Sequence, residues 1–151
     1  MIHKFTKDVY DWLAIAGSLQ GDTTKLNLAF TLVKEEISEL DEAILKRDKD
    51  LICDSIIDSF WTILNVAYFY GVSPEEVNNW IEKVSTSNWS KFCKNEKEAQ
   101  ITVDLYRTGT HPDKRGQIIE CDYEKSGEFW IVKRPDGKIL KSYQYLSVDK
   151  L

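Results

Sequence analysis

Two acidic runs, Lys34-Glu35-Glu36-Ile37-Ser38-Glu39-Leu40 and Asp54-Ser55-Ile56-Ile57-Asp58, decide how this sequence folds. Both runs lie within segments that have the apolar spacing of an α-helix. Residues three or four apart lie on the same side of a helix, so each run presents at least two carboxylates together. Like charges gathered in this way stay ionised only beside cations. The runs therefore predict two neighbouring helices that hold Mg²⁺ or Mn²⁺, the ions that oxygen-only ligands suit.

The apolar pattern predicts four helices in the first part of the chain. They are expected at about residues 5–17, 24–46, 48 or 50 to 70, and 74–85. In the second helix Glu36 lies between Val33 and Leu40, so an acid occupies the middle of the inward side. The third helix is apolar on most sides, which predicts a central, buried helix. Gly71 is expected to close it.

The pattern changes after residue 92. Ala99, Val103 and Tyr106 predict a short fifth helix, although this stretch also suits a strand. Three runs separated by turns then predict a small antiparallel meander, at residues 118–123, 129–132 and 138–140. The predicted fold is mainly α: a four-helix core over residues 1–92, with a helix and β-hairpin appendage over 93–151.

Composition limits the classes of function. The chain has 42% hydrophobic and 30% charged residues, as an ordinary globular protein does. A net charge of -5 argues against binding a nucleic-acid polymer. No signal peptide is expected, and the most apolar stretch, residues 56–70, is predicted to be too short and too polar to span a bilayer. Three cysteines without CxxC spacing indicate reduced thiols and a cytoplasmic location.

The acidic runs have an ordinary alternative. A Glu-Glu-x-x-Glu run is common on the solvated side of a helix. Its pairing with Asp54 and Asp58 in the most apolar helix favours a metal site, because buried acids without partners are costly. Neither His3 nor His111 lies on these helices, which argues against a di-iron centre built from Glu-x-x-His pairs.

The two acidic runs, followed by Ser87-Asn88-Trp89-Ser90-Lys91, resemble the all-α nucleoside triphosphate pyrophosphohydrolase superfamily. This group includes the MazG-like, dimeric dUTPase-like and phosphoribosyl-ATP pyrophosphohydrolase-like proteins. The resemblance spans about residues 5–91. The segments His111-Pro112-Asp113-Lys114 and 136–141, with Tyr145, are similar to the C-terminal segment of phage and bacterial MazG-like members.

The resemblance implies hydrolysis of an NTP or dNTP between its α and β phosphates, Mg²⁺ or Mn²⁺ as cofactor, and a homodimer or homotetramer. The family pattern is Glu-x-x-Glu followed by Glu-x-x-Asp. Ser55 stands where the first acid of the second pair is expected, and Asp54 is the predicted substitute. The implied metal ligands are Glu35, Glu36, Glu39, Asp54 and Asp58, with Glu36 or Glu35 as the general base.

The remaining site residues have weaker signals. The residues expected to bind phosphate are Asn88, Lys91, Lys138, Lys141 and Tyr145, the last three as a flap. The residues expected to bind base or sugar are Trp12, Asn27, Trp61, Asn65 and Tyr68. The ordinary alternatives are surface lysines and core aromatic residues.

Two other functions fit the same residues. The chain could be a catalytically silent nucleotide sensor, which the departure at Ser55 would favour, or a helical scaffold whose acids face a partner. Among substrates, dUTP, dCTP, dGTP and a non-standard nucleotide are all compatible with the sequence.

Overall fold

A computed structural model describes residues 2–151 and divides them into two compact units, one up to Trp80 and the other from Ile81 to Leu151. Within these residues lie five α-helices and one two-stranded antiparallel hairpin. This confirms a helical bundle with a small β appendage. The units divide inside the fourth helix rather than after residue 92, and the functional boundary at residue 92 stays a prediction.

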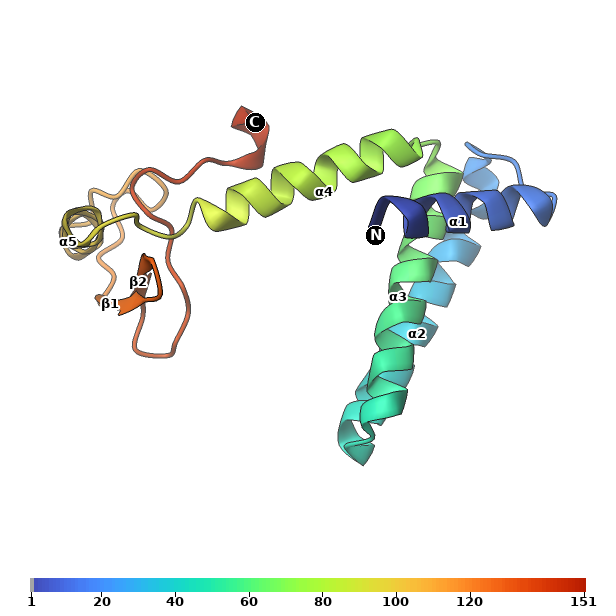
Figure 1. The fold of residues 1–151 in the computed structure, drawn as a ribbon, viewed down its shortest axis with the longest axis horizontal. Helices are drawn as coiled ribbons and strands as arrows, with labels where there is room; N and C mark the ends of the chain where they lie inside the picture. The colour runs from blue at the N-terminus through green and yellow to red at the C-terminus, as the bar shows by residue number, and fades with distance from the viewer. Residues whose placement is uncertain (1) are drawn as a thin grey trace. The chain divides into compact units, whose positions relative to one another are not determined.

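Unit 1 is built on a pair of long helices, α2 (Leu26–Lys46) and α3 (Lys49–Tyr70), which lie side by side (Figure 1). Their connection is short. Arg47 takes the left-handed conformation with φ 56°, and the carboxylate of Asp48 accepts the N–H groups of Asp50 and Leu51 at 3.0 and 3.2 Å. This N-cap starts α3 at once and makes the two helices antiparallel.

The predicted burial of α3 is wrong within the single chain. The side chains that α3 buries are mostly small and polar, among them Ser55, Ser59 and Thr62. Small side chains let two long helices approach closely, and the Ser59 and Thr62 hydroxyls are satisfied by carbonyls one turn back. The large apolar residues remain exposed instead: Ile56, Ile57, Phe60 and Ile63. By length and composition alone α3 could cross a membrane, a test that core helices of soluble proteins also pass.

The core of unit 1 lies where α1 (Ile2–Ile15) crosses the pair (Figure 1). It contains Val9, Tyr10, Leu13, Ala29, Tyr68 and Phe69, with Phe5, Leu26, Trp61, Leu64 and Val66 packed around them. Val9 and Leu13, one turn apart on α1, are 0% and 4% exposed. Ile15, the last residue of α1, is 87% exposed.

Helix α4 (Pro74–Trp89) contributes residues to both units. Ser73 and Glu76 form a reciprocal cap at its start, each accepting the backbone N–H of the other at 3.2 and 2.8 Å. The helix continues four residues beyond the predicted end at 85. Ser87 and Asn88 therefore lie in its last turn rather than in a following loop.

Unit 2 packs α5 (Glu96–Arg107) against strands β1 (Asp122–Ser126) and β2 (Phe129–Lys133). The predicted first strand at 118–123 is placed too early, and the predicted third strand is reduced to one bridge between Lys133 and Ile139. The unit has a core of its own: Cys93, Ala99, Val103, Tyr106, Cys121, Val132 and Leu140. The predicted helix over 99–106 is confirmed.

Candidate active site

The acids of α2 and α3 gather around Glu36. Glu36 is half-buried, whereas the other four acids are exposed. Its pKa is raised, first by burial and then by the charges of Glu39, Asp58, Glu35 and Asp54. Four charges from two helices can act on one carboxyl only if they lie near it. The four acids that act on Glu36 therefore lie within electrostatic range of it, and the role of the five residues as metal ligands stays a prediction.

The departure at position 55 has a structural explanation. Ser55 is buried, and its carbonyl accepts the Ser59 hydroxyl at 2.7 Å. An acid there would be buried in the helix pair. Asp54, one residue earlier, is exposed and contributes to the raised pKa of Glu36. Asp54 and Asp58 are one turn apart, so this pair supplies two carboxylates to one side of α3.

The donor atoms at this site suit a hard divalent cation. Every group is a carboxylate, and within residues 2–151 no Lys or Arg forms an ion pair with any of the five. The raised pKa of Glu36 shows like charges that a cation would relieve. In the described chain no three Asp, Glu, His or Cys side chains are close enough to enclose an ion as they stand. The chemistry of the donors fits Mg²⁺, although the side chains do not form a closed cage.

An aromatic group adjoins the acids along α3. Trp61 lies one turn beyond Asp58, and its ring meets Trp12 and Phe5 edge-on, with centroids 5.9 and 5.8 Å away. Asn65, one turn further, is 6% exposed, and its Oδ1 is buried without a hydrogen-bond partner among the described residues. A buried acceptor without a donor costs free energy, which marks it as a candidate to receive a ligand N–H.

The other two predicted base contacts lie in different surroundings. The Tyr68 ring packs edge-on against Tyr10 and Phe69, and its hydroxyl donates to the carbonyl of Ser18 at 2.9 Å. Tyr68 is therefore a core residue with little surface to offer a base. Asn27 is exposed in the first turn of α2.

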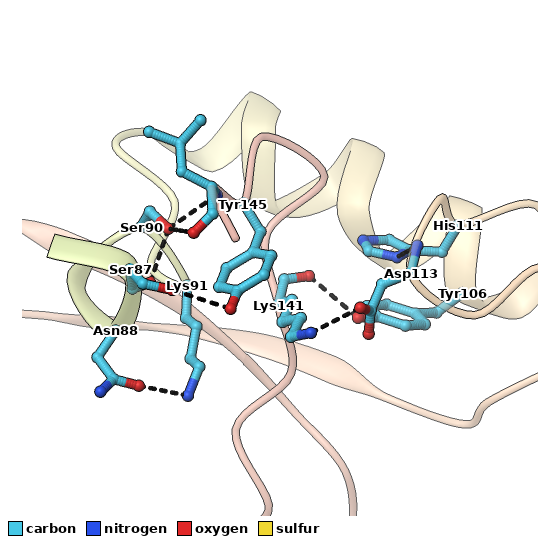
Figure 2. Close-up of polar contacts among 10 residues, drawn as sticks. Ser87, Asn88, Ser90, Lys91, Tyr106, His111, Asp113, Lys141 and Tyr145 are labelled. Carbon is cyan, nitrogen blue, oxygen red and sulfur yellow. Dashed lines mark hydrogen bonds and ion pairs between the residues drawn. The ribbon is translucent and has the colours of Figure 1, made fainter. Parts of the chain in front are cut away.

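In unit 2 the motifs quoted from distant parts of the sequence come together (Figure 2). Lys91 Nζ donates to Asn88 Oδ1 at 2.6 Å, and the Ser142 N–H donates to the Lys91 carbonyl at 3.0 Å. The hydroxyls of Tyr145 and Ser87 are hydrogen-bonded at 2.9 Å. These contacts fasten the segment after Leu140 to the end of α4.

The other part of this cluster surrounds Lys141 (Figure 2). Its ammonium is 2.6 Å from Asp113 Oδ1 and 4.3 Å from the centre of the Tyr145 ring. Its carbonyl accepts the Tyr106 hydroxyl at 3.1 Å. The structure therefore brings Asn88, Lys91, Lys141 and Tyr145 into one cluster. Lys138 is exposed, and its backbone N–H donates to Asp136 Oδ1 at 3.1 Å.

Sequence reasoning gave no role to three residues of this cluster: Ser87, Ser90 and Asp113. Ser90 Oγ accepts the Leu146 N–H at 3.0 Å, and Asp113 is the ion-pair partner of Lys141. Serines in a helix end carry no distinctive signal. The sequence offers one clue to the role of Asp113. It is an acid in the segment His111-Pro112-Asp113-Lys114, and Lys141, a few residues before Tyr145, is a lysine with which it could pair.

Comparison with known families gives one result. Residues 18–87 match the family model described as phosphoribosyl-ATP pyrophosphohydrolase. This chain carries a domain of the all-α nucleoside triphosphate pyrophosphohydrolase superfamily. The match includes all five acids, and it supports a pyrophosphohydrolase-type enzyme at the level of the family. No curated protein and no solved structure showed significant similarity to the chain.

Proposed function

We propose that this protein is a metal-dependent nucleoside triphosphate pyrophosphohydrolase, which converts a (d)NTP and water into the monophosphate and pyrophosphate. The observation that carries the proposal is the grouping of four other carboxylates around Glu36, within the segment that matches the family. Fourteen acids against seven Lys and Arg give residues up to Trp80 a net charge of -7. A triphosphate would be repelled there unless a cation were bound.

The exposed acids Glu35, Glu39, Asp54 and Asp58 would hold Mg²⁺ or Mn²⁺, which leaves the Glu36 carboxylate free to act as a base. When bound, the ion neutralises phosphate charge and lowers the pKa of a coordinated water. Glu36 is the better of the two candidates for general base. It is half-buried among the other acids, whereas Glu35 is exposed, so Glu36 is the better placed of the two to accept a proton from a water held at this site. Transfer of the proton to Glu36 accompanies attack of the water on the α phosphorus, and pyrophosphate leaves.

For the substrate base, we assign recognition to Trp61, Trp12 and Asn65. The two tryptophans provide ring surface, and Trp12 is 54% exposed. Asn65 provides the unpaired acceptor, which fits an N–H on the hydrogen-bonding edge of a base. In unit 2, Asn88, Lys91, Lys141 and Tyr145 offer the ammonium, amide and hydroxyl groups that bind phosphate.

We also assign an interface between copies of the chain to the apolar side of unit 1. An open groove of about 440 Å³ is lined by Phe30, Val33, Ile63, Val66, Ala67, Tyr70 and Val72. Exposed Ile37, Ile44 and Ile56 extend this apolar surface along both helices. Burying it against a second copy, as a homodimer or a dimer of dimers, would remove a cost that one chain alone carries.

The test is a screen of the eight common nucleotides for pyrophosphate release by the full chain, with Mg²⁺, with Mn²⁺ and with EDTA. We expect release from at least one dNTP that EDTA stops and that Glu36→Gln abolishes. Glu42→Gln, an exposed acid of α2 paired with Lys46 at 3.4 Å, is the matched control and should keep activity. Activity that is indifferent to EDTA would contradict the proposal. Metal-dependent nucleotide binding without turnover would instead indicate a silent sensor.

A further inference from the structure

Lys141 is held in a prepared position. Its backbone is fixed by the hydrogen bond from Tyr106, a fully buried side chain, and its ammonium lies over the Tyr145 ring. Tyr145 is in turn fixed through Ser87, which is itself buried. Lys91 lies beside this segment because its carbonyl accepts the Ser142 N–H. The Lys141 ammonium over the Tyr145 ring, with Lys91 on the neighbouring segment, makes a site of positive charge suited to a phosphate group.

In the structure, the negatively charged partner of Lys141 at this site is the carboxylate of Asp113. Its Oδ1 lies 2.6 Å from Lys141 Nζ, the distance of a charge-assisted hydrogen bond. Both side chains retain about 30% exposure, 31% for Lys141 and 29% for Asp113, so an anion from solvent can reach them. A carboxylate in this position has the charge and the oxygen geometry of one edge of a phosphoryl group.

The position of Asp113 is fixed by a buried ring. His111 is 1% exposed and stacks on Tyr106 with centroids 3.8 Å apart and planes 6° from parallel. Its Nδ1 accepts the Asp113 N–H at 3.2 Å. The same tyrosine therefore supports the loop that carries Asp113 and, through its hydroxyl, the backbone of Lys141. This arrangement holds acid and lysine together more firmly than a freely exposed ion pair would be.

We propose that Asp113 is an internal competitor for a phosphate-binding site centred on Lys141. The carboxylate occupies the lysine until a phosphate or pyrophosphate group displaces it, so Asp113 sets how tightly the site binds such anions. The inference deepens the proposed function, on which it rests for the identity of the anion. It does not require the acids of unit 1 to be catalytic.

The experiment is a calorimetric titration of the full-length chain with inorganic pyrophosphate in the presence of EDTA. Turnover and metal binding are absent under these conditions, so failure of the proposed hydrolase activity would not affect the readout. We expect Asp113→Asn to bind pyrophosphate about fivefold more tightly than the wild type. That is the effect of removing one unit charge at about 4 Å in water. Asp113→Glu, which keeps the charge, should stay within about twofold of wild type, a small part of the same electrostatic effect.

The matched control is Glu124→Gln. Glu124 forms a similar ion pair with Lys133, at 2.5 Å on the hairpin of the same unit, so its removal changes the net charge equally. The control should leave pyrophosphate affinity unchanged, and Lys141→Gln combined with Asp113→Asn should lose the gain. Equal affinity in Asp113→Asn and Glu124→Gln, or weaker binding in Asp113→Asn, would overturn the proposal and make Asp113 a residue that positions Lys141.

A second measurement covers the case in which Asp113→Asn folds poorly. In the wild-type chain, pyrophosphate should slow acetylation of Lys141 but not of Lys133, as followed by peptide mass spectrometry. Equal protection of the two lysines, or protection of neither, would contradict displacement of Asp113 at Lys141.

Discussion

The two units of this protein differ in net charge and in whether the charged side chains of their candidate sites form ion pairs. Unit 1, with a net charge of -7, gathers four acids around Glu36, and none of these five carboxylates forms an ion pair with a Lys or Arg of the described chain. Unit 2 has thirteen Lys and Arg against eleven Asp and Glu, a net charge of +2, and it matches its lysines internally, Lys141 with Asp113 and Lys133 with Glu124. Carboxylates without a cationic partner in the chain favour binding of a cation in unit 1. Lysines that are already paired with carboxylates in unit 2 can bind an anion only if it displaces those carboxylates.

The largest expected effect tests whether the unmatched charge of unit 1 is functional. Asp58→Asn removes one carboxylate from the group around Glu36 while keeping its shape. We expect turnover of the preferred nucleotide to fall at least about 100-fold, more than changes outside the direct ligands of a metal usually cause. Steady-state pyrophosphate release measures it. If Asp58→Asn remained as active as Glu42→Gln, Asp58 would contribute no more to catalysis than an exposed acid outside the group, and the proposed metal site would be contradicted.

The next prediction concerns the opposite side of the same helices. Ile63→Glu places a charge in the apolar groove, where burial against a second copy would cost several kcal/mol. We expect the chain to become monomeric by light scattering at micromolar concentration. Ile15→Glu, at a position that is 87% exposed and outside the groove, is the control and should leave the wild-type assembly intact. A wild-type monomer would contradict the proposed interface.

Asn65 provides a neutral counterpart to the unpaired acids of unit 1, because its buried Oδ1 also has no partner among the described residues. Asn65→Leu removes a buried acceptor whose lack of a partner costs about 1–3 kcal/mol. We expect the midpoint of thermal unfolding to rise while nucleotide affinity falls about tenfold, equivalent to about 1.4 kcal/mol. Calorimetry with a non-hydrolysable nucleotide measures the second effect. A loss of stability with unchanged affinity would show that Asn65 is an ordinary core residue.

The smallest effect concerns unit 2. Burial of His111 lowers its pKa below the ordinary value of 6.5, so the fold keeps the ring neutral. The unfolded chain takes up a proton at about that pH, and the folded chain does so only at lower pH. Stability is therefore complete above pH 6.5 and falls below it, by at most about 1.4 kcal/mol per pH unit for one group.

Urea denaturation between pH 8 and pH 5 tests this dependence. His111→Gln should unfold more easily at neutral pH but lose less stability on acidification. An equal pH slope in both proteins would assign the effect to other groups.

Much of unit 1 could be predicted from sequence because its signals are local. The N-cap at Asp48, the closure at Gly71 and the inward position of Glu36 all follow from helical spacing and capping. The sides of α3 could not be assigned in this way. Its apolar residues outnumber the small polar ones, and only the structure shows that Ser55, Ser59 and Thr62 are buried.

Unit 2 was harder to predict because its contacts join distant residues. Alternation of apolar residues located the β region, but residues 118–121 were misassigned because apolar Ile118 and Ile119 lie before the strand, Ile118 being 78% exposed. Nothing local indicates that Tyr145 contacts Ser87 or that Asp113 contacts Lys141. Such pairs are set by packing of the whole unit.

The hydrogen bond between Ser87 and Tyr145 also bears on the order in which the protein folds. It joins residues 58 apart in sequence, whereas α2 and α3 are joined by two residues and pair as soon as both exist. Contacts between distant residues form slowly because a long loop must first close. We expect amide protons of the α2–α3 pair to gain protection earlier in refolding than those of α4 near Ser87. Simultaneous protection in pulse-labelling hydrogen exchange would show instead that the chain folds as a single cooperative unit.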